Sequence, residues 1–292
     1  VWAKDDDKSK SGLRYTITVS TFENKAGWSG QWDIGNGFGE IMTAALQDSG
    51  HFIVIGEKDM RKEAMAEQDF ATSGRVAGGK KAPKVGRMTP AQLLVKGAIT
   101  HVQDSTTGGS GGLSIAGIRV GGSGDKAEIN VTIYLVDSET GQVRASTKVV
   151  GKSGRKGLNV GYYGSKLGGL TGDVAAHQKD NTGKACEDAV AQGVEFLEKQ
   201  LDKIPWEATV VSASGEKIAI NRGSRDGVDV GQQFVVGSAN QVVDPDSGEV
   251  LDNEMNTVGK IEITEVKEKI AYGKPVDGAG KIEKGMSAFP DK

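Results

Sequence analysis

The sequence predicts a mixed α/β domain followed by a small all-β domain. Apolar residues recur at helical and strand-like spacings in turn up to Pro205, and only strand-like runs follow it. A chain of 292 residues is also long enough for roughly two folding units. We therefore expect an N-terminal tail at 1–12, an α/β domain at 13–205 and a β-rich C-terminal module at 206–292.

The first half of the α/β domain alternates short strands with amphipathic helices. The expected order is strand Arg14–Val19, helix Gly37–Asp48, strand Phe52–Ile55, helix Lys58–Thr72, helical turn Pro90–Leu94 and strand Leu94–Val102. Apolar residues of the second long helix fall on a common stripe, which predicts that this stripe is buried. Its members are Met60, Ala64, Met65 and Phe70.

The second half begins with a hairpin and ends with a long helix. Glu128–Val136 alternates apolar and polar residues, Asp137–Gly141 has turn composition, and Gln142–Val150 returns. Helix Gly183–Ile204 carries Cys186 in its apolar stripe, where it is expected to be a buried hydrophobe. The short strands expected beyond Pro205 are Ala208–Val211, Lys217–Ile220, Gln233–Val236, Val258–Val266 and Ile270–Gly273.

Composition excludes several classes of protein. The formal net charge of -3 provides no field that attracts nucleic acid, and a single Cys allows neither an internal disulfide nor a multi-thiolate metal site. No stretch approaches the roughly 20 apolar residues of a membrane-spanning helix. The polar start without Met is typical of an exported chain that has lost its signal segment, or of a trimmed chain, and no Cys lies near it for a lipid anchor.

No motif assembles an active site. The three histidines, His51, His101 and His177, lie far apart in the sequence without a nearby carboxylate cluster. Gly35–Gly39 lacks the spacing of a dinucleotide loop, and Ser153–Lys156 lies in a Gly-rich loop that cannot present a catalytic lysine. Asp244–Glu249 has its Gly in the wrong place for a calcium loop and reads as a hairpin turn. We therefore expect no enzyme activity, no cofactor and no metal.

Two Gly-rich segments, 104–126 and 151–181, interrupt the α/β domain. Loops of this length are uncommon in a compact domain unless they are functional. They are either flexible loops or β-hairpins that each subunit contributes to a shared membrane barrel, since both are long enough for two strands of 9 to 11 residues. The apolar and aromatic residues of these candidate hairpins are Leu113, Ile115, Ile118, Val120, Leu158, Val160, Tyr162 and Leu167.

The order of these elements resembles the CsgG family, the channels through which curli subunits leave the cell. The resemblance covers about two thirds of the chain. It is carried by Thr16–Asn24, Ala45–Ile55, Lys96–Thr100, Asn130–Gly141 and the helix that contains Cys186. The final module, with Ile218–Gly223, Gly227–Gln232 and Val258–Ile261, is similar to the C-terminal module of the flagellar-ring protein FlgT.

The resemblance implies an α/β domain like the anticodon-binding fold, with two inserted hairpins that build a barrel in a ring of identical subunits. In such a ring the loop after the first strand narrows the pore, which implies that Trp28, Gln31 and Trp32 line the lumen or make contacts there. The implied function is an outer-membrane secretion or export channel that handles an exported protein or envelope partner. A periplasmic or cell-surface structural ring without a pore is the alternative, because the candidate hairpins are weakly apolar.

Overall fold

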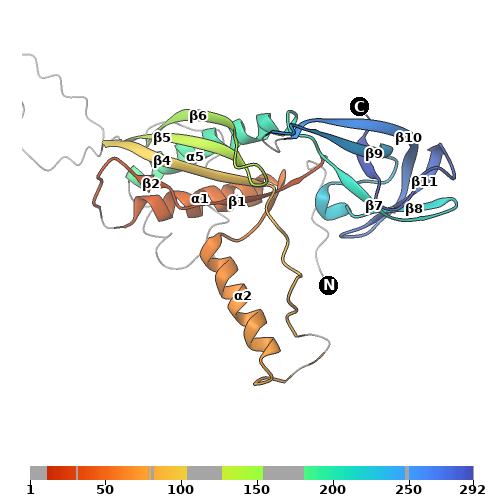
Figure 1. Ribbon diagram of the computed structural model, residues 1–292. Coiled ribbons are helices and arrows are strands. Elements are labelled where there is room, and N and C mark those ends of the chain that lie inside the picture. The colour runs from red at the N-terminus through yellow and green to blue at the C-terminus, as the bar shows by residue number, and fades with distance from the viewer. Residues whose placement is uncertain are drawn as a thin grey trace, which may run out of the picture. The chain divides into compact units, whose positions relative to one another are not determined.

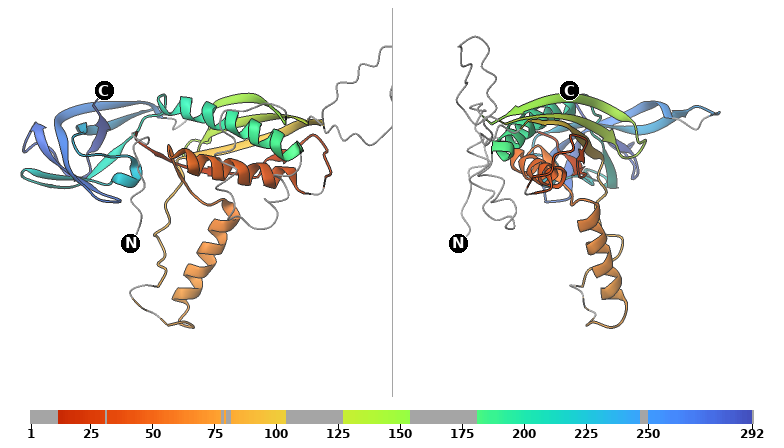
Figure 2. Two further views of the ribbon diagram at one scale, coloured as in Figure 1. Left: turned by 180° about the vertical axis from the view of Figure 1, so that it is seen from behind. Right: turned by 90° about the vertical axis from the view of Figure 1, so that its left-hand side faces the viewer.

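The computed structural model describes residues 12–30, 32–77, 79, 82–103, 127–153, 181–246 and 250–291. They form a mixed α/β chain with two separate sheets, and the second sheet is antiparallel throughout. The α/β unit comprises Thr16–Gln200, and the barrel unit comprises Leu201–Lys292 with the N-terminal segment up to Tyr15. Figures 1 and 2 show the elements of each unit. The predicted class, mixed α/β followed by β only, is confirmed.

The sheet of the α/β unit has the strand order β3-β1-β4-β5-β6, with β2 beside β4. β1 and β4 are parallel, and β4, β5 and β6 form an antiparallel meander. The strands are β1 (Tyr15–Val19), β2 (Glu23–Asn24), β3 (Phe52–Val54), β4 (Leu93–Gln103), β5 (Glu128–Asp137) and β6 (Val143–Lys152).

Two helices, α1 (Ile34–Ser49) and α5 (Asn181–Leu201), cover one face of this sheet (Figure 2). Their packing is close at Gly193 of α5, where an added Cβ would lie 2.6 Å from Ile133 Cδ1 and 2.8 Å from Met42 Cε. Cys186 is fully buried in α5, as expected. The core between sheet and helices includes Ile17, Val95, Ile99, Ile129, Ile133, Phe38, Met42, Leu46 and Leu197.

The predicted hairpin is confirmed as β5 and β6, and side chains fix its turn. Backbone N–H groups of Glu139 and Thr140 donate to Asp137 Oδ1 at 2.9 and 3.1 Å, and Arg144 donates to Oδ2 at 2.7 Å. Gly141 takes the left-handed conformation with φ of 72°, which a side chain would disfavour.

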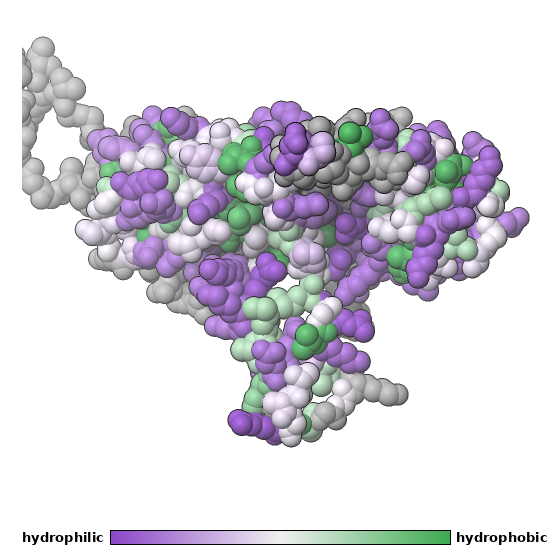
Figure 3. Space-filling model, viewed as in Figure 1, coloured by the Kyte–Doolittle hydropathy of each residue, from purple (hydrophilic) through white to green (hydrophobic). Residues whose placement is uncertain are grey.

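Helix α2 (Lys58–Thr72) forms where it was predicted, but its expected stripe is not buried. None of its residues is buried, and Met60, Met65 and Phe70 are 57%, 47% and 47% exposed. The prediction of a buried stripe is therefore wrong, because α1 and α5 already cover the helical face of the sheet. Figure 1 shows α2 projecting from the rest of the α/β unit, and Figure 3 shows green surface atoms among the purple ones there.

Several predicted boundaries also need correction. The first helix begins at Ile34 because Asp33 caps it, and no helical turn forms at Pro90–Leu94. Instead the Gln92 backbone N–H donates to Thr16 O at 3.0 Å, which holds this segment extended beside β1. The second Gly-rich insertion does not start at 151, because β6 continues to Lys152, and it ends before α5 begins at Asn181.

The sheet of the barrel unit closes in the order β10-β11-β8-β7-β12-β9. Its strands are β7 (Ala208–Ser214), β8 (Lys217–Ile220), β9 (Gln233–Val243), β10 (Val250–Val266), β11 (Ala271–Asp277) and β12 (Ser287–Pro290), with a short 3-10 helix at Ser224–Asp226. β12 was not predicted, and β9 and β10 are longer than expected because the whole of β9 pairs with residues Val250–Glu262 of β10.

Hydrogen bonds attach the N-terminal segment to the rest of the barrel unit. Tyr15 Oη donates to Ile204 O at 2.6 Å, Trp206 Nε1 donates to Arg14 O at 3.3 Å, and Arg14 N donates to Asp226 O at 2.8 Å. Burial, with a further contribution from the charge of Asp202, raises the pKa of Tyr15 to about 12. The Tyr15 hydroxyl therefore remains a protonated donor throughout the physiological range.

Candidate functional site

One end of the α/β sheet gathers the segments that the sequence singled out. β2, β4 and β6 run in the same direction and end at Asn24, Gln103 and Lys152, and β5 starts there at Glu128. The loop at 25–33 therefore leaves from the same end as the chain that enters 104–126 and the chain that follows β6. We call this end of the sheet the loop end.

At the loop end, β4, β5 and β6 stay paired up to their terminal residues. Glu128 of β5 is paired with both Gln103 of β4 and Lys152 of β6. Lys152 Nζ lies 3.1 Å from Glu128 Oε2, and the Ala127 N–H donates to Ser153 Oγ at 2.8 Å. The chain thus leaves and re-enters the sheet at adjacent, hydrogen-bonded positions.

Helix α5 also fixes the end of β6. The carboxylate of Asp188, a buried residue, accepts from the Lys152 backbone N–H at 2.9 Å and from Gln192 Nε2 at 3.1 Å. Gln192 Nε2 also donates to Val150 O at 2.9 Å. Sequence reasoning missed these two residues, although an acid on the apolar face of a helix is a recognisable signal of a buried polar role.

The loop at 25–33 starts from a fixed strand. β2 pairs with β4 through Glu23 opposite Ala98 and Asn24 opposite Ile99, and the Lys25 N–H donates to Ile99 O at 2.9 Å. Lys25 Nζ also lies 3.2 Å from Glu23 Oε2, an exposed pair that contributes little stability. The strand β2 was not predicted, because two exposed polar residues give no alternating pattern.

Two tryptophans meet within this loop. The Trp28 and Trp32 rings lie 5.1 Å apart between centroids at an interplanar angle of 61°, an edge-on arrangement that aromatic pairs favour. Asn24 clamps the turn, since its Nδ2 donates to Trp28 O at 2.7 Å and its Oδ1 accepts from Trp28 N at 3.3 Å. Both rings are only half-buried. We call residues 24–33 the aromatic loop.

Glycine makes the aromatic loop compact. The Trp28 ring lies against Gly30 so closely that no Cβ fits there, and Gly27 has φ of 65°. A side chain at Gly30 would push the indole away. The position of the Trp28 ring therefore depends on Gly30.

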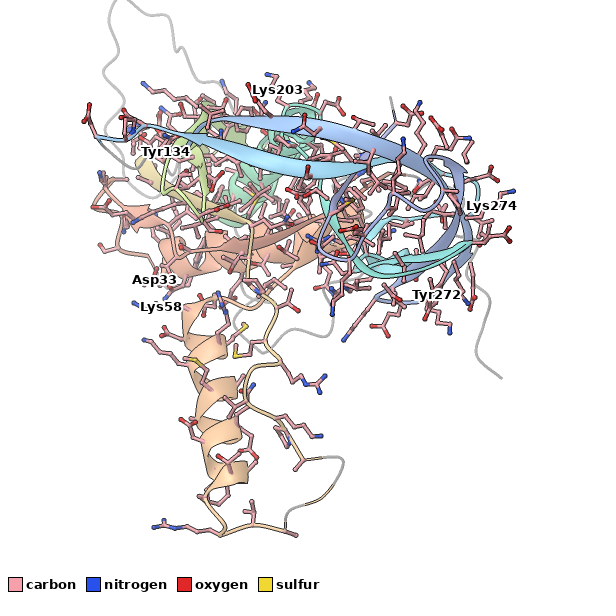
Figure 4. All side chains as sticks on the ribbon, turned by 45° about the vertical axis from the view of Figure 1, so that its right-hand side comes forward. Asp33, Lys58, Tyr134, Lys203, Tyr272 and Lys274 are labelled. Carbon is pink, nitrogen blue, oxygen red and sulfur yellow. The ribbon has the colours of Figure 1, made fainter. Side chains whose placement is uncertain are left out.

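The far end of the aromatic loop is fixed to α1. Asp33 Oδ1 accepts from the N–H groups of Gly35 and Asn36, each at 2.9 Å, which caps the helix (Asp33 is labelled in Figure 4). The Phe22 N–H donates to Gly35 O at 3.3 Å, and the Phe22 ring packs on Phe38 with centroids 4.6 Å apart. Both ends of the aromatic loop are thus attached to buried structure, while its tryptophans remain accessible.

Of the predicted lumen residues, Trp28 and Trp32 lie together, and Gln31 lies outside the described residues. The candidate hairpin residues also lie outside them: Leu113, Ile115, Ile118, Val120, Leu158, Val160, Tyr162 and Leu167. Within the described ranges, no group of three or more His, Cys, Asp or Glu side chains is placed to hold a metal ion. None of the helices that the structure describes is long and apolar enough to cross a membrane.

Comparison with known proteins gives one match by sequence family. The family described as "Curli production assembly/transport component CsgG" matches residues 6–227. None of the curated proteins compared with the chain matches it.

The solved structures that match the chain do so at low similarity. The PelC dodecamer from Paraburkholderia phytofirmans is 16% identical with a TM-score of 0.27, and the match covers 46% of this chain and 69% of that one. The hypothetical protein CT253 from Chlamydia trachomatis is 13% identical with a TM-score of 0.33, over 63% and 96% of the two chains. The LpoB C-terminal domain from Escherichia coli is 15% identical with a TM-score of 0.27, over 49% and 85%.

Proposed function

The chain belongs to the CsgG family, and from this membership we propose that it is a non-enzymatic subunit of a homo-oligomeric ring in the bacterial cell envelope. In this proposal the ring is an outer-membrane channel for secretion or export, and its cargo is an exported protein. The observation that carries the proposal is the loop end of the sheet, from which the aromatic loop and the chain into both Gly-rich insertions depart.

The geometry of the loop end suits a channel subunit. Segments that leave one end of a rigid sheet can be presented together to neighbouring subunits around a ring axis. Hairpins contributed in this way would pair their edges from copy to copy, which lipid requires. The two insertions, 104–126 and the segment between Ser153 and Asn181, are the proposed hairpins, and they carry the candidate barrel residues named above.

The aromatic loop is the proposed constriction. It is attached to β4 on one side and to α1 on the other, so it can hold a fixed aperture. The half-buried Trp28 and Trp32 would meet an unfolded polypeptide through aromatic contacts, and Gln31 would lie beside them. The barrel unit, which resembles the FlgT C-terminal module in sequence, is the proposed site for an envelope partner.

A conductance measurement tests the constriction. Purified rings of the full chain are inserted into planar lipid bilayers, and single-channel conductance is compared between the wild type and Trp28→Ala/Trp32→Ala. Removal of two indoles should raise the conductance, because the narrowest section widens. Phe70→Ala, an exposed aromatic on α2, is the matched control and should leave conductance unchanged. Equal conductance in all three would contradict the assignment of the aromatic loop.

Deletion of 108–124 tests the membrane barrel itself. Rings that lack this segment should no longer fractionate with membranes, because the barrel cannot close. Continued membrane association of the deleted protein would remove the channel proposal. Rings that form in both proteins without detergent would favour the alternative, a structural ring in the periplasm or on the cell surface, to which the weakly apolar composition of 104–126 also points.

A further inference from the structure

The barrel unit contains a two-stranded ribbon whose outer edges have no neighbour. β9 and β10 pair from Val243 opposite Val250 down to the barrel, but β12 pairs with β9 only over Phe234–Gly237. β11 pairs with β10 only over Lys260–Val266. In the described residues, therefore, 238–243 and 250–257 form a ribbon with no third strand, and Figure 2 shows it extending beyond the barrel.

Such a ribbon is unusual, because isolated two-stranded hairpins are marginally stable and exposed edges invite pairing with another strand. Closure removes the edges of the barrel itself, whereas within the described residues of this unit the ribbon edges present N–H and C=O groups that no neighbouring strand pairs. An extended segment added along one edge would satisfy them, which is a common mode of recognition.

The charge of the ribbon indicates what kind of segment it accepts. The ribbon and the turn that joins its strands, residues 238–259, contain five acidic residues and no Lys or Arg: Asp252 and Glu254 lie in the ribbon, and Asp244, Asp246 and Glu249 lie between its strands. Asp246 and Glu254 are exposed. A basic extended segment is therefore the complementary partner.

The same chain carries a segment of opposite charge. Residues 73–90, between α2 and β4, contain five basic residues and no Asp or Glu; the bases are Arg75, Lys80, Lys81, Lys84 and Arg87. Lys84 and Arg87 are exposed, and among the described residues they form no ion pair with any carboxylate. Residues 83–90 contain a turn at Val85–Gly86, where Gly86 has φ of 77°, and within the described part of the chain no backbone hydrogen bond joins them to another element.

We propose that the ribbon edge of one copy accepts the 83–90 segment of a second copy, which straightens at Val85–Gly86 to form an added strand, and that the acids of the ribbon and of the turn between its strands face Lys84 and Arg87. Two unpaired backbones of opposite charge then satisfy each other at a junction between subunits. This inference rests on the ring of the proposed function and adds to it a contact from the barrel unit of one subunit to the α/β unit of the next.

Charge reversal on the full-length protein tests the junction, with assembly followed by analytical ultracentrifugation. Asp246→Lys/Glu254→Lys and Lys84→Glu/Arg87→Glu should each weaken association roughly tenfold, because two attractive pairs become repulsive. Lys281→Glu/Lys284→Glu alters two exposed lysines elsewhere on the barrel unit and makes the same change in net charge as the second variant. This control should associate like the wild type, and circular dichroism checks that every variant is folded.

A mixture of the two charge-reversed variants tests whether the contact joins two copies of the chain. An equimolar mixture of the two reversed variants should recover association to within about threefold of the wild type, because every junction between unlike copies is again complementary. Recovery in the chain with all four substitutions but not in the mixture would place the contact within one chain and overturn the inference. Rings that form normally in every variant would also overturn it, while leaving the proposed ring intact.

Hydrogen exchange provides the second readout. Amides of 84–89 and 253–257 should become protected on assembly if strands pair, and unchanged exchange at both segments in assembled rings would overturn the pairing. A wild-type chain that remains monomeric at every concentration, with and without detergent, would instead overturn the ring of the proposed function, and the junction with it.

Discussion

Helices α1 and α2 show the same kind of sequence pattern and have opposite surroundings. Nine residues of α1 are buried against the sheet, whereas α2 has none. The difference arises from the sheet, because α1 and α5 already occupy the face on which helices pack. It teaches that an amphipathic pattern indicates a helix but does not identify the surface that will cover it.

The largest expected contrast is between two phenylalanines. Phe38→Ala in α1 removes a fully buried ring that packs on Phe22, and it should lower the free energy of unfolding by about 3–5 kcal/mol. Phe70→Ala in α2 should change it by less than about 0.5 kcal/mol, since the ring is already half exposed. Urea unfolding followed by circular dichroism measures both, and equal effects would show that α2 is packed after all.

Two glycines extend the comparison to the chain around these helices. Gly151→Ala in β6 would place a Cβ 1.9 Å from Ala185 O of α5, so strand or helix must move, at a cost of roughly 1–3 kcal/mol. Gly79→Ala, in the segment after α2, meets no atom within 4 Å and should be nearly neutral. A thermal melt of each variant measures the change in stability. An unchanged melting temperature for Gly151→Ala would contradict the tight packing of α5 on β6.

The helix caps give a smaller contrast. Asp33→Ala removes the side chain that accepts two backbone hydrogen bonds at the start of α1 and should cost about 1 kcal/mol. Glu57 precedes α2 without a side-chain capping bond, so Glu57→Ala should stay within about 0.5 kcal/mol. The same urea experiment applies, and Asp33→Asn, which retains an acceptor, should restore most of the loss.

The smallest effect concerns the pKa of one carboxylate on α5, which packs on the sheet, and of one on α2, which does not. Burial raises the pKa of Glu187 on α5 above 4.5, only partly offset by Lys184. The hydrogen bond and charge of Lys62 lower the pKa of Asp59 on α2 below 3.8. The contribution of Glu187 to folding stability is therefore fully present below its unfolded pKa and is lost as pH rises through its folded pKa. The contribution of Asp59 has the opposite sign: it is present above pH 3.8 and is lost as pH falls through its folded pKa. Carboxyl carbon NMR titration measures both, and Lys62→Ala should return the pKa of Asp59 toward 3.8.

Sequence reasoning predicted most elements but not their surroundings. The hairpin of β5 and β6 was predictable because alternation and turn residues are local signals. β12, of four residues, and the outer parts of β9 and β10 were not, since Asn253–Thr257 is polar and is held extended only by its partner strand. Pro90–Leu94 resembled a helix start, yet the hydrogen bonds between Gln92 and Thr16 hold it extended beside β1 in the interior of the sheet.

Part of the candidate site was also predictable. Trp28 and Trp32 were identified from the position of their loop after the first strand, and the structure places their rings in contact with each other. The clamp by Asn24 was missed, because a hydrogen bond from a side chain to a residue four positions later leaves no compositional trace. The attachment of β6 by Asp188 was missed because it joins residues 36 positions apart.

The paired strand ends at Gln103, Glu128 and Lys152 have an engineering consequence. Neighbouring strands in a sheet stand about 5 Å apart, so a two-residue turn can join β4 directly to β5. The α/β unit can then be shortened, or given hairpins from another protein, without a change to the residues of its core.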